Sequence, residues 1–126
     1  MTRIPEDDRD IFEKAIFLPM VLTILNRDLS AIETAGFKLK KPYLHLLEHT
    51  MKKVQKDLYT IKQQMKKKNM KVWEKQRDEA FTLFSFMYRG YEEEHNYFNP
   101  RIRNEVQLLL ESYFIEKSPC KQKPEN

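Results

Sequence analysis

One apolar seam limits the folds open to this chain more than any other feature of its sequence. Its members alternate at spacings of three and four residues, and they are Leu44, Leu47, Met51, Val54, Leu58, Ile61 and Met65. Such spacing places all of them on one side of an α-helix, and a neighbouring helix covers so narrow a stripe. The seam therefore predicts a long helix, opening at Pro42, within a helical bundle.

A second seam of the same spacing predicts an earlier helix, from Pro5 to Ala35. Its members are Ile11, Ala15, Leu18, Leu22, Leu25, Leu29 and Ile32. Three acidic residues follow Pro5, where they complement the positive end of the helix dipole. Pro19 lies inside the pattern and removes one backbone hydrogen bond, so we expect the helix to be kinked or broken near Pro19.

Two further helices are predicted in the rest of the chain. One runs from Met70 to Phe98, weakened at Gly90, and the other begins at the capping pair Asn99-Pro100. With only 2 glycines and 6 prolines in 126 residues, we predict an all-α, antiparallel up-and-down bundle of four helices. Residues 1–117 form its single domain, and residues 118–126 form a disordered polar tail.

Composition favours a water-soluble, cytoplasmic protein. Hydrophobic residues make up 40% of the chain and charged residues 33%, which suits a soluble bundle rather than a disordered chain. No stretch reaches about 18 uncharged apolar residues and the start lacks a signal peptide, so we expect neither a membrane span nor a membrane partner. The single Cys120 excludes a disulfide framework and a thiolate metal site.

Four stretches of sequence are distinctive without matching a catalytic motif. They are Thr2–Asp8, Leu18–Leu22, Phe37–Tyr43 and Tyr97–Arg103. In these stretches, and over most of the chain up to the tail, the sequence resembles the YhjD-like family of short, uncharacterised helical proteins from Gram-positive spore-forming bacteria. The resemblance implies a bacterial cytosolic setting and supplies no functional residues.

The segment from His45 to His49 matches the H-x-x-E-H pattern of inverted zinc peptidases, with Glu48 as the base. Two histidines four residues apart chelate a metal when both face a cleft. Here the apolar seam fixes the buried direction, and the histidines bracket the outer face, so we interpret them as solvated. His45, His49 and His95 lie at similar heights along the predicted bundle, which permits a three-histidine site. The directions in which they point around their helices disfavour it.

A second metal pattern is Glu92-x-x-His95, the pair used in ferritin-like di-metal bundles. Such a site needs two of these pairs and two further inward carboxylates, and the chain has one pair. Glu94 continues the apolar seam of the expected third helix, so it needs an ion-pair partner, Arg101 or Arg103, or a metal ion. The ion pair is favoured, and we expect no catalytic residue and no cofactor.

Positive charge is concentrated around the predicted turn between the second and third helices. Residues 52–77 include ten basic and two acidic residues, a local charge of +8 against +4 for the whole chain. The candidates for binding an anionic partner, such as nucleic acid, are Lys62, Lys66, Lys67, Lys68 and Lys71. In the alternative interpretation these lysines stabilise the helix end, and acidic residues of the first helix lie beside them.

Seven aromatic rings fall within residues 81–98: Phe81, Phe84, Phe86, Tyr88, Tyr91, Tyr97 and Phe98. They either pack in the core or form an interface, whose candidates are Phe81, Phe84, Phe86, Tyr88 and Tyr91. Our leading hypothesis is a non-enzymatic interaction protein that pairs with itself as a homodimer, through the third helix or the kinked first helix, or that pairs with another protein. Binding of an anion or nucleic acid is the alternative, and a metal-binding bundle using Glu92, Glu94 and His95 comes third.

Overall fold

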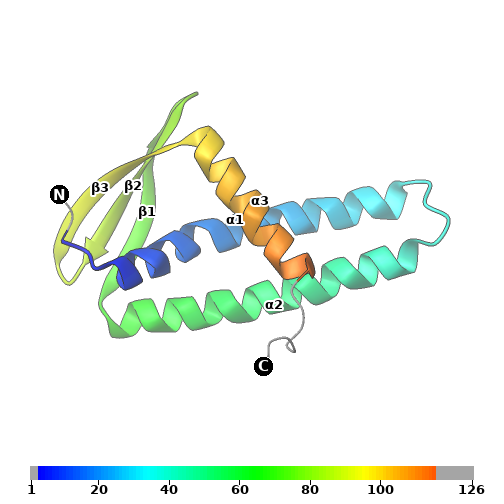
Figure 1. Ribbon diagram of the computed structural model, residues 1–126, viewed down its shortest axis with the longest axis horizontal. Coiled ribbons are helices and arrows are strands. Elements are labelled where there is room, and N and C mark those ends of the chain that lie inside the picture. Colours follow the sequence, from blue (N-terminus) through cyan, green and yellow to red (C-terminus); the bar gives the residue numbers. More distant parts are fainter. Residues whose placement is uncertain (1–2, 116–126) are drawn as a thin grey trace.

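The chain folds as three helices and a three-stranded antiparallel sheet, so the predicted all-α bundle of four helices is wrong. The computed structural model describes residues 3–115. In chain order the elements are α1 (Glu6–Thr34), α2 (Lys40–Lys67), β1 (Met70–Arg77), β2 (Phe81–Tyr88), β3 (Tyr91–Phe98) and α3 (Asn99–Ile115). The long α1–α2 hairpin has the sheet beside one end, and α3 crosses α1 (Figure 1). The predicted disordered tail, 118–126, lies outside the described residues.

The two apolar seams meet in the α1–α2 hairpin, which confirms the first two predicted helices. Four of the seven α2 seam residues are buried and the other three are half-buried. The predicted break at Pro19 is absent, because α1 is a single helix from Glu6 to Thr34. Pro19 is exposed, whereas Leu18 and Val21 beside it are buried, so packing on the opposite face holds the helix across the missing hydrogen bond.

Residues 70–98 form β1, β2 and β3 instead of the predicted third helix, in the spatial order β1-β2-β3. In β2 the side chains of Thr82, Phe84 and Phe86 are buried. Their aromatic and β-branched types favour strands, and alternate residues of a strand face opposite sides of a sheet. On a helix, residues 80–88 would be apolar on more than one side. Most of them instead form β2, a strand with two apolar faces.

Gly90 marks a hairpin turn and not a weak point in a helix. Arg89 and Gly90 both have positive φ, 55° and 81°, and they alone separate β2 from β3. Two such residues make the type I′ turn, whose twist matches that of antiparallel strands. Tyr88 and Tyr91 pair directly across the turn.

Asp78 closes the turn between β1 and β2. Its carboxylate accepts hydrogen bonds from the backbone N–H groups of Phe81 and Ala80, at 2.7 and 2.8 Å, and these bonds lower its pKa. Asn99, at the start of α3, donates its side-chain amide to the Asp78 carbonyl at 3.0 Å and accepts a hydrogen bond from Thr82. The predicted fourth helix is thus confirmed as α3, and its first residue ties it to the sheet.

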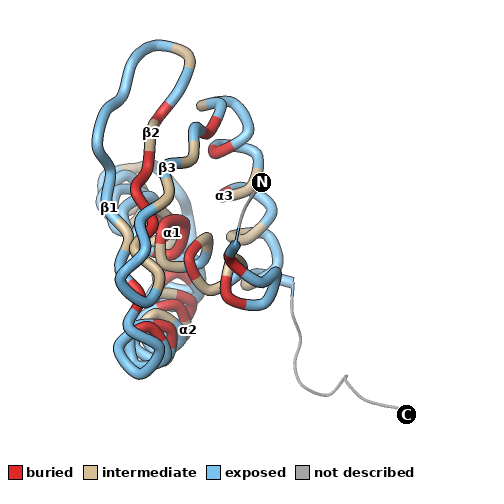
Figure 2. The backbone as a smooth tube through the Cα atoms, turned by 90° about the vertical axis from the view of Figure 1, so that its left-hand side faces the viewer, coloured by how far each residue is buried: buried red, intermediate tan, exposed pale blue. Residues whose placement is uncertain are grey.

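The core lies between α1, α2 and the inner face of the sheet, where Figure 2 shows the buried positions gathered along β2 and the adjoining sides of the helices. Phe12 and Phe86 are fully buried and stack with their ring centroids 4.6 Å apart. Tyr97 packs edge-on against Phe17 and Phe84. The aromatic side chains of the sheet that face α1 are therefore part of the core.

By length and composition α1 is apolar enough to cross a membrane. An 18-residue window within it has a mean hydropathy of 1.5, and 28% of that window is buried. The core helix of a soluble protein passes the same test. Here α1 packs against α2, the sheet and α3, and its buried side chains form much of the core.

Asp8 joins the start of α1 to the ends of α2 and β2. Its carboxylate is buried and accepts hydrogen bonds from the Lys68 ammonium at 2.7 Å and the Tyr88 hydroxyl at 2.6 Å. The bond from Lys68, followed by that from Tyr88, lowers the pKa of Asp8. This contact confirms that the lysine-rich turn lies beside the acidic start of the first helix.

We predict that Asp8→Asn lowers stability at neutral pH by about 1–3 kcal/mol, since a buried, charge-assisted pair of hydrogen bonds is lost. A carboxyl group whose pKa is lowered by folding stabilises the protein above its unfolded pKa of about 3.9. That contribution disappears as the pH falls through the lower, folded value. Urea denaturation between about pH 6 and pH 2 should therefore show a shallower acid dependence for Asp8→Asn than for wild type. The exposed neighbour, as Asp7→Asn, is the control, and equal acid dependence in all three proteins would contradict this role of Asp8.

Candidate functional site

One face of the sheet remains exposed in the described part of the chain. The strand pairing aligns its outward residues in four rows: Lys71, Met87 and Glu92; Trp73, Ser85 and Glu94; Gln76, Leu83 and Asn96; and Phe81 beside Phe98. We call these residues, together with Lys75, the outer face. The inner face, on the opposite side of the same strands, packs against α1. The outer face is therefore the broadest part of the sheet open to a partner.

The outer face is divided into three columns, one on each strand. The β1 column is basic, with Lys71 and Lys75, and the β3 column is acidic, with Glu92 and Glu94. The β2 column between them is mainly apolar, with Phe81, Leu83 and Met87. A column of apolar side chains between opposite charges is a pattern found at protein interfaces.

Three aromatic rings enlarge the apolar part of the outer face. Trp73 is 40% exposed, Phe81 40% and Phe98 49%. The rings of Phe81 and Phe98 lie side by side, with centroids 5.3 Å apart. Large aromatic side chains exposed together are costly to leave in water and are typical of binding surfaces.

A polar bridge crosses the middle of the outer face. The Lys75 ammonium bonds to Glu94 and lies 3.8 Å from the Glu92 carboxylate. The bond to Glu94 raises the pKa of Lys75. Beneath this bridge the Ser85 hydroxyl is fully buried and donates to Glu92. The bridge fixes the acidic column in place and satisfies the buried hydroxyl.

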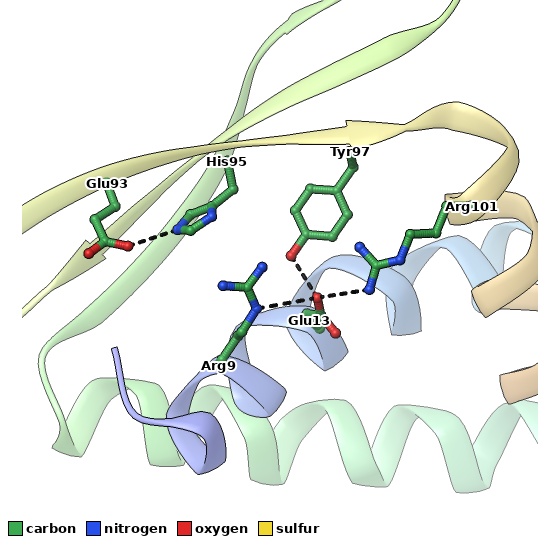
Figure 3. Close-up of polar contacts among 6 residues, drawn as sticks. All are labelled: Arg9, Glu13, Glu93, His95, Tyr97 and Arg101. Atoms are coloured by element: carbon green, nitrogen blue, oxygen red, sulfur yellow. Dashed lines mark hydrogen bonds and ion pairs between the residues drawn. The ribbon is translucent and has the colours of Figure 1, made fainter. Parts of the chain in front are cut away.

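His95 and Glu93 form a pair on the inner face, visible in Figure 3. The His95 Nε2 atom lies 2.8 Å from the Glu93 carboxylate. The imidazole also packs on the Phe86 ring, with ring centroids 4.6 Å apart. Glu93 accepts a second hydrogen bond from the Arg3 backbone N–H, at 2.9 Å, so the pair secures the N-terminal segment against β3.

A neighbouring cluster, also drawn in Figure 3, connects β3 to α1 through Glu13. The fully buried Tyr97 donates its hydroxyl to the Glu13 carboxylate at 2.7 Å, and burial, followed by this bond, raises the pKa of Tyr97. Arg9 and Arg101 lie 3.8 and 3.6 Å from the same carboxylate. Because the Glu13 carboxylate contacts the Tyr97 hydroxyl and two guanidinium groups, this cluster anchors β3 and α3 on α1.

The predicted metal ligands are separated in the fold. Glu92 and Glu94 lie on the outer face, whereas His95 lies on the inner face, because residues one apart in a strand point to opposite sides. His45 and His49 are exposed on α2, whose start lies at the end of the hairpin remote from the sheet (Figure 1). Within residues 3–115, no group of three or more His, Cys, Asp or Glu side chains is placed to hold a metal ion. The expected inward Glu94 is wrong: it is exposed and pairs with a lysine, not with an arginine.

The five candidate lysines do not lie together on one surface. Lys68 bonds to Asp8, and Lys71 belongs to the outer face. The others, Lys62, Lys66 and Lys67, are exposed along the last turns of α2. The structure therefore divides this set between a structural ion pair, the sheet and the helix surface.

The five aromatic interface candidates are divided in the same way. Phe81 lies on the outer face, while Phe84, Phe86 and Tyr88 lie on the inner face towards α1. Tyr91 is also at an inner-face position, and the Arg3 guanidinium lies 4.6 Å from its ring. Sequence reasoning missed Leu83 and Met87, which alternation at a period of two groups with Phe81 on one face of β2, and it left Phe98 outside the interface set.

A pocket of about 480 Å³ lies between α1, α3 and the end of the sheet. Its apolar lining is Met20, Ile24, Ile102, Val106 and Leu110, and Arg77 and Arg103 also border it. The buried Thr82 hydroxyl in its lining already bonds to Asn99 at 2.7 Å. The Thr82 hydroxyl therefore already has its hydrogen-bond partner within the fold. The outer face, in contrast, exposes basic, apolar and acidic side chains.

Comparisons with known proteins agree with the family resemblance drawn from the sequence. A family model described as YhjD protein matches residues 3–118. The protein named "Uncharacterized protein YhjD" from Bacillus subtilis (strain 168) is 48% identical over 115 residues, which cover 91% of this chain and 96% of that relative. No solved structure matches the chain significantly. Neither matching description names an enzymatic activity.

Proposed function

This chain belongs to the YhjD family, and we propose that it is a non-enzymatic, cytoplasmic interaction protein that pairs with a second copy of itself through the outer face. The observation that carries the proposal is the three-column pattern of basic, apolar and acidic side chains on that face. Such a pattern is complementary to its own copy, as an isologous interface requires.

A twofold axis along the central strand brings the columns into register. Rotation about an axis parallel to β2 places β1 of one chain over β3 of its partner. Lys71 then lies opposite the partner's Glu92, because these two residues share a row, whereas Lys75 and Glu94 are already paired within each chain. The apolar column packs on its own copy, and the strands of the two sheets remain nearly aligned, as in β-sandwiches.

The face is better suited to pairing than the free edge of β1. The pairing of β1 with β2 shifts register between Glu74 and Gln76, so β1 carries a bulge near its end. Bulges and charged side chains on an edge strand oppose the addition of another strand. Partner recognition by side chains of the outer face avoids this obstacle.

We predict that Lys71→Glu or Glu92→Lys alone weakens the dimer about tenfold, since each places like charges opposite one another at two symmetric positions. The double variant exchanges the charges in that row and should restore the dissociation constant to within about threefold of wild type, with circular dichroism to show that the fold survives the loss of the Ser85 bond to Glu92. Sedimentation velocity over a concentration series measures all four proteins.

Lys62→Glu is the matched control for charge alone, because Lys62 is exposed on α2 away from the sheet row. It should leave the dissociation constant within about twofold of wild type. If the losses in dimerisation free energy of the two single variants simply add in the double variant, the proposed register is wrong. If no protein in the set associates, pairing itself is wrong.

A further inference from the structure

The connection between α1 and α2 presents a second surface, independent of the sheet. Residues 35–46, which we call the hairpin tip, join the two helices and include the first turns of α2. Four of their apolar side chains are exposed: Phe37 by 45%, Leu39 by 69%, Tyr43 by 50% and Leu46 by 45%. The rings of Phe37 and Tyr43 contact each other edge-on, with centroids 5.1 Å apart. The tip therefore holds an ordered group of apolar side chains outside the core.

The charge of the hairpin tip has one sign. Residues 35–46 contain Lys38, Lys40 and Lys41 and no aspartate or glutamate. The Lys40 ammonium donates to the Glu33 carbonyl at 2.8 Å and so caps the last turn of α1. Lys38 and Lys41 are exposed and form no ion pair within the described residues. Two lysines thus remain available to an anionic partner.

The hairpin tip also projects away from the rest of the fold. In Figure 1 the sheet lies at one end of the α1–α2 hairpin, α3 crosses near the middle, and the tip extends from the other end. Neither the sheet nor α3 contributes to it. A flat surface can therefore approach the tip without meeting another element, even while the outer face is occupied.

We propose that the hairpin tip docks on the surface of an anionic phospholipid bilayer. Phe37, Leu39 and Tyr43 enter the interfacial region, where apolar and aromatic side chains leave water. Lys38 and Lys41 remain level with the headgroup phosphates and attract them. This proposal departs from the expectation of no membrane partner, which depended on the absence of a spanning segment and of a signal peptide.

The mixture of side chains favours a lipid surface over a nucleic acid. Phosphate contacts along a nucleic acid require a basic stripe, and the tip offers two unpaired lysines. Leu39, the most exposed apolar side chain of the tip, has no role in stacking with bases, since it lacks an aromatic ring. Its burial is favourable in an acyl-chain boundary, because apolar area leaves water.

Flotation with vesicles of phosphatidylcholine, with and without phosphatidylglycerol, tests the proposal on the full-length protein. Wild type should float only with the anionic vesicles. Lys38→Gln/Lys41→Gln should weaken binding about 25-fold, at about fivefold per lysine. Phe37→Ser/Leu39→Ser should weaken it at least tenfold. Lys66→Gln/Lys67→Gln, which removes two exposed lysines from the other end of α2, should bind like wild type.

A fluorescence measurement keeps the test independent of any loss of folding. Trp73 is the single tryptophan, so Leu39→Trp in a Trp73→Phe background reports on the tip alone. Its emission should shift to the blue with anionic vesicles and stay unchanged with neutral ones or with DNA. Absence of a shift, equal binding to neutral vesicles, or loss of binding in the Lys66/Lys67 variant would overturn the proposal. Binding to DNA that Phe37→Ser/Leu39→Ser leaves intact would assign the tip to a polyanion instead.

Discussion

Phe86→Ala should lower the free energy of unfolding by about 3–5 kcal/mol, the range for truncating a buried phenylalanine. Phe86 is fully buried in the middle of β2 and contacts three rings from two elements: Phe12 of α1, and His95 and Tyr97 of β3. Its removal leaves a cavity at the junction of the sheet and α1. Because the sheet is held on α1 by this junction, the loss should affect the whole unfolding transition.

Urea denaturation at one fixed protein concentration measures this loss, since dimerisation would make stability depend on concentration. Tyr59→Ala is the matched control, because this aromatic residue is 66% exposed on α2 and should change stability by less than about 0.5 kcal/mol. Similar costs for the two substitutions would show that β2 does not pack on α1 through Phe86.

Leu83→Glu should abolish pairing of the chains without unfolding them. Leu83 lies in the central column of the outer face and is half-buried in the single chain. In the twofold arrangement it packs near its own copy, so the substitution buries two carboxylates against each other. Central interface positions cost about 2 kcal/mol or more, so the dissociation constant should rise at least about 30-fold.

Sedimentation velocity reports the dissociation constant, and circular dichroism shows whether the fold survives. Leu39→Glu makes the same chemical change at the hairpin tip, where Leu39 is 69% exposed, and should leave pairing unchanged. A Leu83→Glu protein that is folded and pairs like wild type would remove the outer face from the interface.

The long helices are predictable because their apolar residues keep one period over many turns. The seam from Leu44 to Met65 remains regular for six steps, and a regular seam is compatible only with a helix. The contact between Asp8 and Lys68 follows from it, since two antiparallel helices must bring the start of the first to the end of the second. This part of the prediction did not depend on what came after α2.

Residues 70–98 are harder to assign from sequence. A short apolar run such as Ala80–Tyr88 fits both a buried helix and a strand with two apolar faces, and periodicity alone does not separate them. The deciding signal is the dipeptide Arg89-Gly90, which lies between two tyrosines and takes the positive φ values of a hairpin turn. Within an assumed helix the same Gly90 is only a weak point, so its interpretation depends on the element assumed around it.

The error in secondary structure carried over to the candidate sites. On a helix Glu92 and His95 share a side, whereas on a strand they face opposite sides of the sheet. Phe81, Phe84 and Phe86 were grouped as neighbouring aromatic residues of one helix, although only Phe81 lies on the outer face. The aromatic excess still predicts a surface in this region, but which residues belong to that surface depends on the period.

Light scattering of the wild-type protein during gel filtration is the simplest check on pairing through the outer face. At micromolar concentrations we expect a molar mass of twice the 15.3 kDa of one chain, falling to that of one chain in Leu83→Glu. A wild-type mass of 15.3 kDa throughout the micromolar range would contradict the proposal.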